Sequence, residues 1–332
     1  MRPLDPAARH PSDPPPTGRD SPLRPLTADE RPEYFRGVHP LWGGGLDLES
    51  FVAYQRRLAA SPEAEWRFEL LGYFEAGRML SAMKVYRLEG QHEGTPMLVR
   101  GIGAVFTPPP LRRHGYAARM MRLGLQRFAA EGSHAALLFS DIGLRYYERL
   151  GFRALESAEC KVDASMLPKG RGARAAMAGD EVRMAQALAR HRANAAGVTL
   201  ARDGWSLRFQ LRRLRELARA RNVGEPDWGL IVDGPGNSAS AAAMIRHTKD
   251  GLDILDAAWD TGAGRDALLG AVRDRLSRAG RSTIRYWPAH QLRGLFPAGP
   301  RTSALAMVAT LQPLARAIPL GARAELALLD HI

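Results

Sequence analysis

The distribution of hydrophobic positions predicts an antiparallel meander in the first third of the chain. Three runs rich in aromatic and aliphatic residues, at 66–74, 79–88 and 97–107, are separated by turn-forming stretches that contain glycine. The third run stops at three consecutive prolines, 108–110, because proline cannot take part in strand hydrogen bonding. Apolar positions at helical spacing over 48–58 predict a helix before these strands.

After the prolines, the pattern alternates between helix and strand. Helical spacing over 115–131 is closed by Gly132 and followed by a short apolar run at 134–140. A second helical segment at 142–150 and a strand at 152–162 complete the series. This order predicts an α/β (α+β) fold with a mixed, mostly antiparallel sheet, a βαβ crossover and flanking helices.

The second half of the chain repeats this order, which predicts tandem domains related by an internal repeat. The predicted helices are 181–194, 204–221, 265–279 and 290–296, and the predicted strands are 228–233, 238–247, 252–259, 282–287 and 303–311.

Composition marks the domain boundaries. Residues 1–32 hold nine of the 23 prolines and few apolar residues, so we expect a disordered tail there. Residues 166–180, rich in glycine, alanine and arginine, are predicted to be a linker. The predicted domains are therefore 33–165 and 181–332.

Charge and cysteine content exclude several classes of protein. The net charge is +12, but only four of the 47 basic residues are lysines, so the excess indicates composition bias and not nucleic-acid binding. No run approaches the ~18–20 apolar residues of a membrane span, and the N-terminus lacks the apolar core of a signal peptide. We expect a cytoplasmic protein without a membrane partner. The single Cys160 excludes an internal disulfide, and the scattered histidines predict no metal site.

The segment 112–117 (RRHGYA) carries the first chemical signal, the pattern R-x-x-G-x-(G/A) between a strand and a helix. A helix start offers free N–H donors and a favourable dipole, and Gly115 permits close backbone approach, so this loop suits a pyrophosphate. It is neither a Walker A loop nor G-x-G-x-x-G. The alternative is that Arg112 and Arg113 are ordinary solvated charges.

A second motif, 147–152 (YERLGF), follows after a short strand. Residues 101–152 together resemble the GNAT superfamily of acyl-CoA-dependent N-acyltransferases, in which YEKLGF is a recurrent motif. Residues 138–143 followed by this motif are similar to the fungal lysine N-acetyltransferases and their bacterial relatives. The tandem organisation also resembles the enhanced-intracellular-survival acetyltransferases, whose second domain is degenerate.

The resemblance implies direct transfer of an acetyl group from acetyl-CoA, as co-substrate and without a metal, to a primary amine that is small or lysine-like. Pantetheine would lie where the strand ending at 107 splays from the strand 134–140, and the pyrophosphate would lie on the backbone of 113–117. The implied cofactor-binding residues are Val105, Phe106, Thr107, Arg112, Arg113, His114, Gly115, Tyr116, Ala117 and Ala118.

The resemblance also assigns catalytic roles. Tyr147 matches the general acid, since a phenol of pKa ~10 can protonate a thiolate of pKa ~8.5; the alternative is simple packing against Phe152. Ser140 is expected either to contact pantetheine or to cap the next helix. For Asp141 we expect a cap rather than a base.

Two further groups of residues are candidates for the acceptor side. Glu69, Lys84 and Tyr86 lie on strands that face the acceptor cleft in this fold. The chain end returns to the active site in the tandem relatives, so the carboxylate of Ile332, or Asp330 beside it, is a candidate base. The alternative is a terminal strand in the second sheet.

The second half lacks both motifs, at 260–265 and in the segment 290–296, so we expect it to serve as a scaffold. Two other functions remain open. One is a GNAT-like acyl-CoA-binding or regulatory protein without turnover. The other is RNA binding by the arginines of 205–221, although leucines at helical spacing favour a packed helix there. The acceptor and the oligomeric state are left open.

Overall fold

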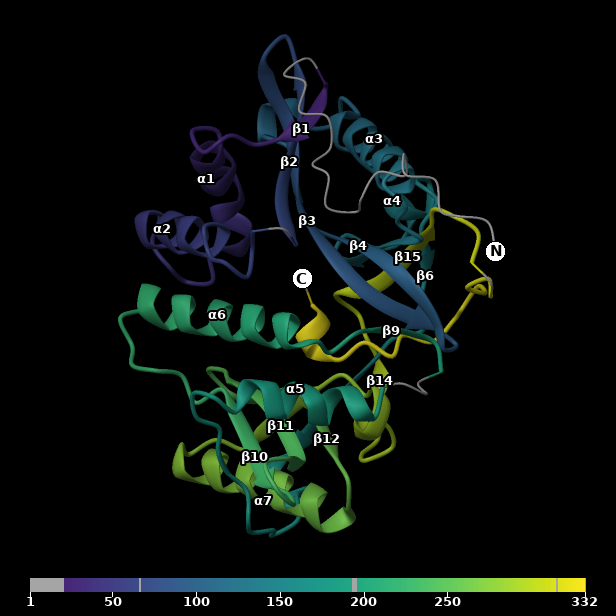
Figure 1. Ribbon diagram of the computed structural model, residues 1–332. Coiled ribbons are helices and arrows are strands. Elements are labelled where there is room, and N and C mark those ends of the chain that lie inside the picture. Colours follow the sequence, from purple (N-terminus) through teal and green to yellow (C-terminus); the bar gives the residue numbers. More distant parts are fainter. Residues whose placement is uncertain (1–20, 66, 193–195, 315, 332) are drawn as a thin grey trace.

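The structure is a computed structural model that describes residues 21–65, 67–192, 196–314 and 316–331. Two mixed sheets, each flanked by helices, are stacked with helix α6 (Gly204–Ala220) and the C-terminal segment between them (Figure 1). This architecture confirms the predicted α/β fold class. The other helices are α1 (Arg31–Trp42), α2 (Leu48–Ala59), α3 (Tyr116–Ala130), α4 (Arg145–Glu148), α5 (Glu181–Arg190) and α7 (Gly262–Arg278).

The strands of the two sheets follow equivalent orders. The first sheet runs β1 (Leu23–Pro25), β2 (Phe68–Glu75), β3 (Arg78–His92), β4 (Thr95–Phe106), β5 (Ala135–Ser140), β15 (Leu305–Thr310), β6 (Arg153–Ala154), and β9 (Val198–Leu200) pairs with β3. The second runs β8 (Arg174–Ala175), β10 (Gly229–Asp233), β11 (Ala239–His247), β12 (Gly251–Trp259), β13 (Thr283–Tyr286), β7 (Ala158–Asp163), β14 (Gly299–Pro300). The equivalence agrees with the internal repeat inferred from the sequence.

Each half of the chain lends one strand to the sheet of the other half. β7 pairs with β13 in the second sheet, although it follows directly on the first set of elements. β15 pairs with β5 over the full length of both strands, although it closes the second set. From the sequence, β7 and β15 were each expected in the sheet of their neighbours in the chain. An apolar pattern shows that a strand is buried but not in which sheet it lies.

Helices cover both faces of the first sheet. α1 and α2 pack on the face that carries Ala82 and Tyr86 of β3, whereas α3 and α4 pack on the face that carries Met83 and Val85. This alternation follows from the two-residue period of a strand. The face under α1 and α2 also contacts Phe209 of α6, so α6 joins the two halves.

The N-terminal boundary differs from the expectation of a disordered tail up to residue 32. β1 pairs with β2, and Leu23 and Leu26 are buried. These two leucines pack into the core clusters of the first sheet, which the proline-rich composition of this segment did not predict. α1 was also missed, because it contains Pro40 and proline normally interrupts a helix. Residues 1–20 of the predicted tail, and Trp66 of a predicted strand, lie outside the described residues.

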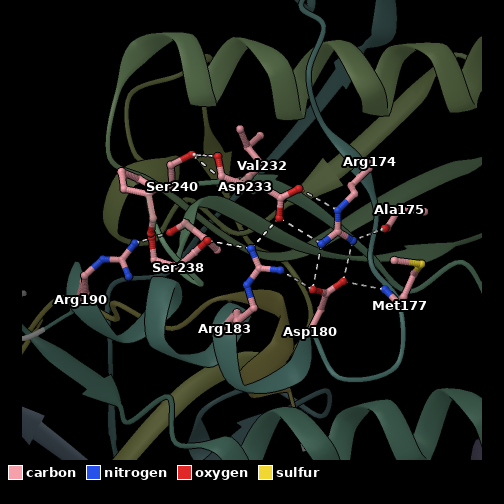
Figure 2. Close-up of polar contacts among 12 residues, drawn as sticks. Arg174, Ala175, Met177, Asp180, Arg183, Arg190, Val232, Asp233, Ser238 and Ser240 are labelled. Carbon is pink, nitrogen blue, oxygen red and sulfur yellow. Dashed lines mark hydrogen bonds and ion pairs between the residues drawn. The ribbon is translucent and has the colours of Figure 1, made fainter.

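The predicted linker 166–180 lies along the second sheet, fixed by an ion-pair cluster (Figure 2). Arg174 donates to both carboxylate oxygens of Asp180, at 2.7 and 3.0 Å, and to Asp233 at 3.0 Å. Arg183 joins the same two carboxylates, at 2.9 Å to Asp180 and 2.5 Å to Asp233. These contacts hold the start of α5 against the β10–β11 hairpin.

A second ionic network lies in the interior between the halves. Asp256 of β12 accepts from Arg192 and from Arg202, both at 2.5 Å, and Arg202 also binds both oxygens of Asp330 at 2.5 and 2.7 Å. These four side chains are almost completely buried. Burial raises the pKa of Asp256, but both arginines stabilise its charged form. The pKa of Asp256 therefore lies below its ordinary value.

Replacement of Asp256 by Asn is expected to destabilise the protein by about 3–5 kcal/mol, because two arginines would lose their shared counter-charge in a dry environment. Asp233→Asn is the matched control. Asp233 also binds two arginines, but its side chain is 54% exposed against 3% for Asp256, so its loss should cost about 1 kcal/mol or less. Urea denaturation measures both values. Equal destabilisation by the two substitutions would contradict this reading of the buried network.

Candidate functional site

The first sheet opens between β4 and β5. The two strands pair in parallel from Val99 and Ala135 to Ile102 and Leu138, and β4 then continues to Phe106 without a partner on β5. The pairing of β4 with β3 shifts register in the same region, where Ala104 has φ +46°. An extra residue of this kind bends a strand. The strands therefore separate at this end of the sheet, as the sequence analysis expected.

The free end of β4 is held from the side of α1 and β3. The Tyr34 hydroxyl donates to the Ala104 carbonyl at 2.8 Å, and the Ser81 hydroxyl donates to the Phe106 carbonyl at 2.8 Å. The Phe106 ring approaches Gly37 so closely that a Cβ at residue 37 would clash with it. Tyr34, Gly37 and Ser81 were missed by the sequence analysis, because none carries a local signal for a contact so distant in the chain.

The loop after β4 leads to a helix start that no side chain caps. Gly115 is the N-cap of α3 with φ +81°, a conformation that favours glycine, and Arg113 has φ +68°. The first N–H groups of α3, from Tyr116 to Ala118, have no partner within the helix. Arg112, Arg113 and His114 are exposed beside them. This loop therefore offers backbone donors, a helix dipole and two guanidinium groups to an anion.

Two further contacts shape the loop. Arg112 Nε donates to the Thr107 carbonyl at 3.2 Å, and His114 Nδ1 donates to the Arg112 carbonyl at 2.8 Å. The His114 ring stacks on Tyr116 with centroids 5.8 Å apart. The predicted phosphate-contacting residues are thus brought together at one end of α3, next to the opening between β4 and β5.

The equivalent positions of the second half are filled by the protein itself. Thr261 caps α7 by accepting from Gly264 N at 3.1 Å. At the end of β12, both backbone groups of Trp259 bond to the side-chain amide of Gln291, at 2.8 and 2.7 Å. The start of α7 is therefore capped by a side chain, unlike that of α3, and the end of β12 is bonded to Gln291.

Tyr147 lies in α4 and packs in the same core cluster as Ile102 of β4 and Leu138 of β5, the last residues at which these strands pair. Its ring packs edge-on against Phe152 and Tyr146, with centroids 6.0 and 5.0 Å away, and the residue is 8% exposed. Burial is the main reason that the pKa of Tyr147 is raised to about 12, so the phenol keeps its proton at neutral pH. Within the described ranges, its hydroxyl has no hydrogen-bond partner. Tyr147 is therefore both packed and protonated, with no hydrogen bond to hold its hydroxyl within the described ranges.

Ser140 and Asp141 do not cap α4, whose N-cap is Leu144. The buried Ser140 hydroxyl donates to the Gly143 carbonyl at 2.6 Å and shapes the turn before the helix. Asp141 accepts from Ala304 N at 2.8 Å, at the entrance of β15. Asp141 thus connects the two halves, a contact that spans too much of the chain to be read from sequence.

Only two of the three residues expected on the acceptor face lie there. Lys84 and Tyr86 point toward α2 and α6: Lys84 Nζ donates to Gln55 Oε1 at 2.9 Å, and the Tyr86 ring lies 6.1 Å from that of Phe209. Glu69 lies on the opposite face, where it binds Arg127 of α3 at 3.3 Å. Its expected position was wrong, because it follows Phe68 by one residue and a strand alternates its faces.

The C-terminal segment reaches β5 but does not form a strand. Residues Leu328–Asp330 form a 3-10 turn, η4, so the alternative of a terminal strand there is wrong. Asp330 is also excluded as a free base, because Arg202 and the amide of Ala327 bind its carboxylate. The His331 ring lies 5.3 Å from that of Phe139, the neighbour of Ser140. Ile332 lies outside the described residues.

Neither a cluster of metal ligands nor a membrane-spanning helix is found among the described residues. Within the described part of the chain, no group of three or more His, Cys, Asp or Glu side chains is arranged to hold a metal ion. No described helix has the length and apolar character that a membrane span requires.

Comparison with known proteins agrees with this geometry. Residues 23–155 match the family model of the acetyltransferase (GNAT) domain. No curated protein sequence matches the chain.

Solved structures with similar folds share little sequence with the chain. A GCN5-related N-acetyltransferase from Anabaena variabilis is 12% identical with a TM-score of 0.67, covering 87% of this chain and 72% of that one. One from Kribbella flavida is 17% identical with a TM-score of 0.62, covering 86% and 70%. Eis1 from Mycobacterium abscessus is 17% identical with a TM-score of 0.53, covering 87% and 73%. Residues 23–155 thus match the GNAT acetyltransferase domain model, and the chain as a whole is similar in fold to these GCN5-related N-acetyltransferases.

Proposed function

We propose that the protein is an acetyl-CoA-dependent N-acetyltransferase that acts on a primary amine in the cytoplasm. The observation that carries this proposal is the contrast between the two halves. The first half leaves a helix start uncapped beside two exposed arginines and the opening between β4 and β5, whereas in the second half Thr261 caps the equivalent helix and Gln291 bonds to the end of β12. We assign catalysis to the first half and a supporting role to the second.

The acetyl-CoA site would use the backbone of Val105, Phe106 and Thr107 for pantetheine and the loop 112–118 for the pyrophosphate. The amine nitrogen attacks the thioester carbon, the carbonyl oxygen becomes an oxyanion, and the C–S bond then breaks. A strand N–H near Phe106 is the proposed oxyanion donor. Tyr147 donates its proton to the departing thiolate and recovers one from solvent.

The proton of the amine needs an acceptor. We propose the terminal carboxylate of Ile332, directly or through water, because the Arg202–Asp330 pair anchors the preceding residues and His331 contacts β5. The resemblance to fungal lysine N-acetyltransferases favours a small or lysine-like acceptor.

The experiment that tests the proposal is release of free thiol from acetyl-CoA in the presence of a panel of primary amines. Amine-dependent release, with the acetylated amine identified by mass, supports the enzyme. Binding of acetyl-CoA without release from any amine would favour a sensor or regulatory protein instead.

Tyr147→Phe is expected to lower turnover by ~10²–10⁴, the usual contribution of a general acid, while acetyl-CoA binding is kept. The matched control is Tyr146→Phe, which removes a neighbouring hydroxyl that is buried without a partner. Steady-state kinetics and calorimetry give the two quantities. An unchanged kcat in Tyr147→Phe would exclude this role.

Gly115→Val is expected to weaken acetyl-CoA binding by tenfold or more, roughly the effect of distorting one charge-assisted contact, because valine resists positive φ and would reshape the anion loop. Gly132→Val is the control, since Gly132 has the same φ of +81° and equally open surroundings but lies at the other end of α3. Calorimetry with acetyl-CoA compares them. Equal affinity in both variants would refute the placement of the pyrophosphate.

Deletion of His331 and Ile332 is expected to lower turnover by ~10² or more while acetyl-CoA affinity and thermal stability are kept, since Asp330 and its pair with Arg202 remain. Ile332→Ala serves as the control because it retains a terminal carboxylate at the same position. Full turnover in the shortened chain would remove the carboxylate from the mechanism.

A further inference from the structure

A cavity of about 80 Å³ lies where α2, α6, the second sheet and the C-terminal segment meet. Its polar lining consists of Tyr54, Gln210, Arg213, Arg246 and His331. None of the described residues that line it is acidic. His331 also contacts Phe139 near the end of β5, so one wall of the cavity lies next to the end of that strand.

Arg213 is the central cation of this cavity. Its Nη1 donates to Gln210 Oε1 at 2.9 Å, and Gln210 in turn donates to the Leu329 carbonyl at 2.9 Å. Over the described part of the chain, no carboxylate lies within ion-pair distance of Arg213. Its neighbours on α6 differ, because Arg212 pairs with Glu63 at 3.4 Å and Arg215 pairs with Glu225 at 2.5 Å.

The other charges around the cavity are also mainly positive. Arg246 binds Asp253 at 2.5 Å, but Asp253 is shared with Arg285 at 2.9 Å, so one carboxylate serves two guanidinium groups. Among the described residues Lys84 bonds only to the neutral Gln55, and burial followed by repulsion from Arg213 lowers the pKa of Lys84 to about 7. Burial, followed by repulsion from Arg213, lowers the pKa of His331 to about 4, and Asp141 acts in the opposite direction.

Arg213 is a partly buried guanidinium held by the Gln210 amide and by the His331 carbonyl at 3.5 Å, and it has no carboxylate partner among the described residues. A guanidinium in such a setting is a ready binding group for an anion. We infer that this cavity holds an anionic group of the acceptor, so that the acceptor is an amine that also carries a carboxylate or a phosphate. Arg213 is then the residue that binds the anion and turns the amine toward β5. This inference rests on the proposed function for the role of the bound amine, but the anion site itself can be tested by binding alone.

The test uses two matched pairs of amines with the full chain. L-Lysine and cadaverine differ by a carboxylate, and O-phosphoethanolamine and ethanolamine differ by a phosphate. Calorimetry without acetyl-CoA measures binding, and thiol release with acetyl-CoA measures turnover. We expect the anionic member of at least one pair to bind tenfold or more tightly than its neutral counterpart, and the pair concerned tells carboxylate from phosphate.

Three single substitutions in α6 test whether Arg213 causes the preference for the anionic amine. Arg213→Gln should abolish the preference for the anionic amine, Arg213→Lys should retain part of it, and Arg208→Gln, which removes an exposed arginine from the same helix, should leave it unchanged. The inference is overturned if neither anionic amine binds better than its counterpart, or if Arg213→Gln and Arg208→Gln behave alike. Preferential binding with no thiol release would uphold the anion site and count against the proposed acetyltransferase.

Discussion

The pairing of β15 with β5 is the constraint on which the rest of the structure depends. It satisfies the edge of β5 that faces away from β4, so that β5 is held in place while its other edge separates from β4 beyond Leu138. An unpaired β5 would have two incomplete edges at the point where the sheet must open. The site thus owes its shape to a strand supplied from the far end of the chain.

The two halves share one topology but differ in the hydrogen bonds made where their strands separate. In both, a parallel pair of strands separates and a helix begins close to the separation. In the first half no side chain caps the helix start, whereas in the second half Thr261 caps it and Gln291 bonds to both backbone groups of Trp259. Buried or partly buried backbone groups need partners, so an open set indicates a ligand and a closed set indicates a structural role. The second half contributes α6 and the C-terminal segment to the lining of the cavity of about 80 Å³.

The sequence was sufficient where the information is local. The meander, the crossover helix α3 and the R-x-x-G-x-(G/A) loop follow from periodicity and from glycine and proline positions, and all lie where they were expected. Contacts between distant segments could not be foreseen. Ser140 and Asp141 looked like caps, yet one shapes a turn and the other binds the start of β15. Asp330 looked like a free carboxylate until Arg202, far away in the chain, was placed beside it.

The exchange of β7 and β15 also has a consequence for synthesis on the ribosome. The partner that completes β5 (Ala135–Ser140) is β15 (Leu305–Thr310), so the backbone edge of β5 stays unpaired while residues 141–304, which lie between the two strands, are synthesised. Long-range pairing of this kind slows folding and leaves an edge available for association with other chains. We therefore expect the first sheet to be completed only after β15 has been synthesised, and the edge of β5 to be most prone to association with other chains before that point.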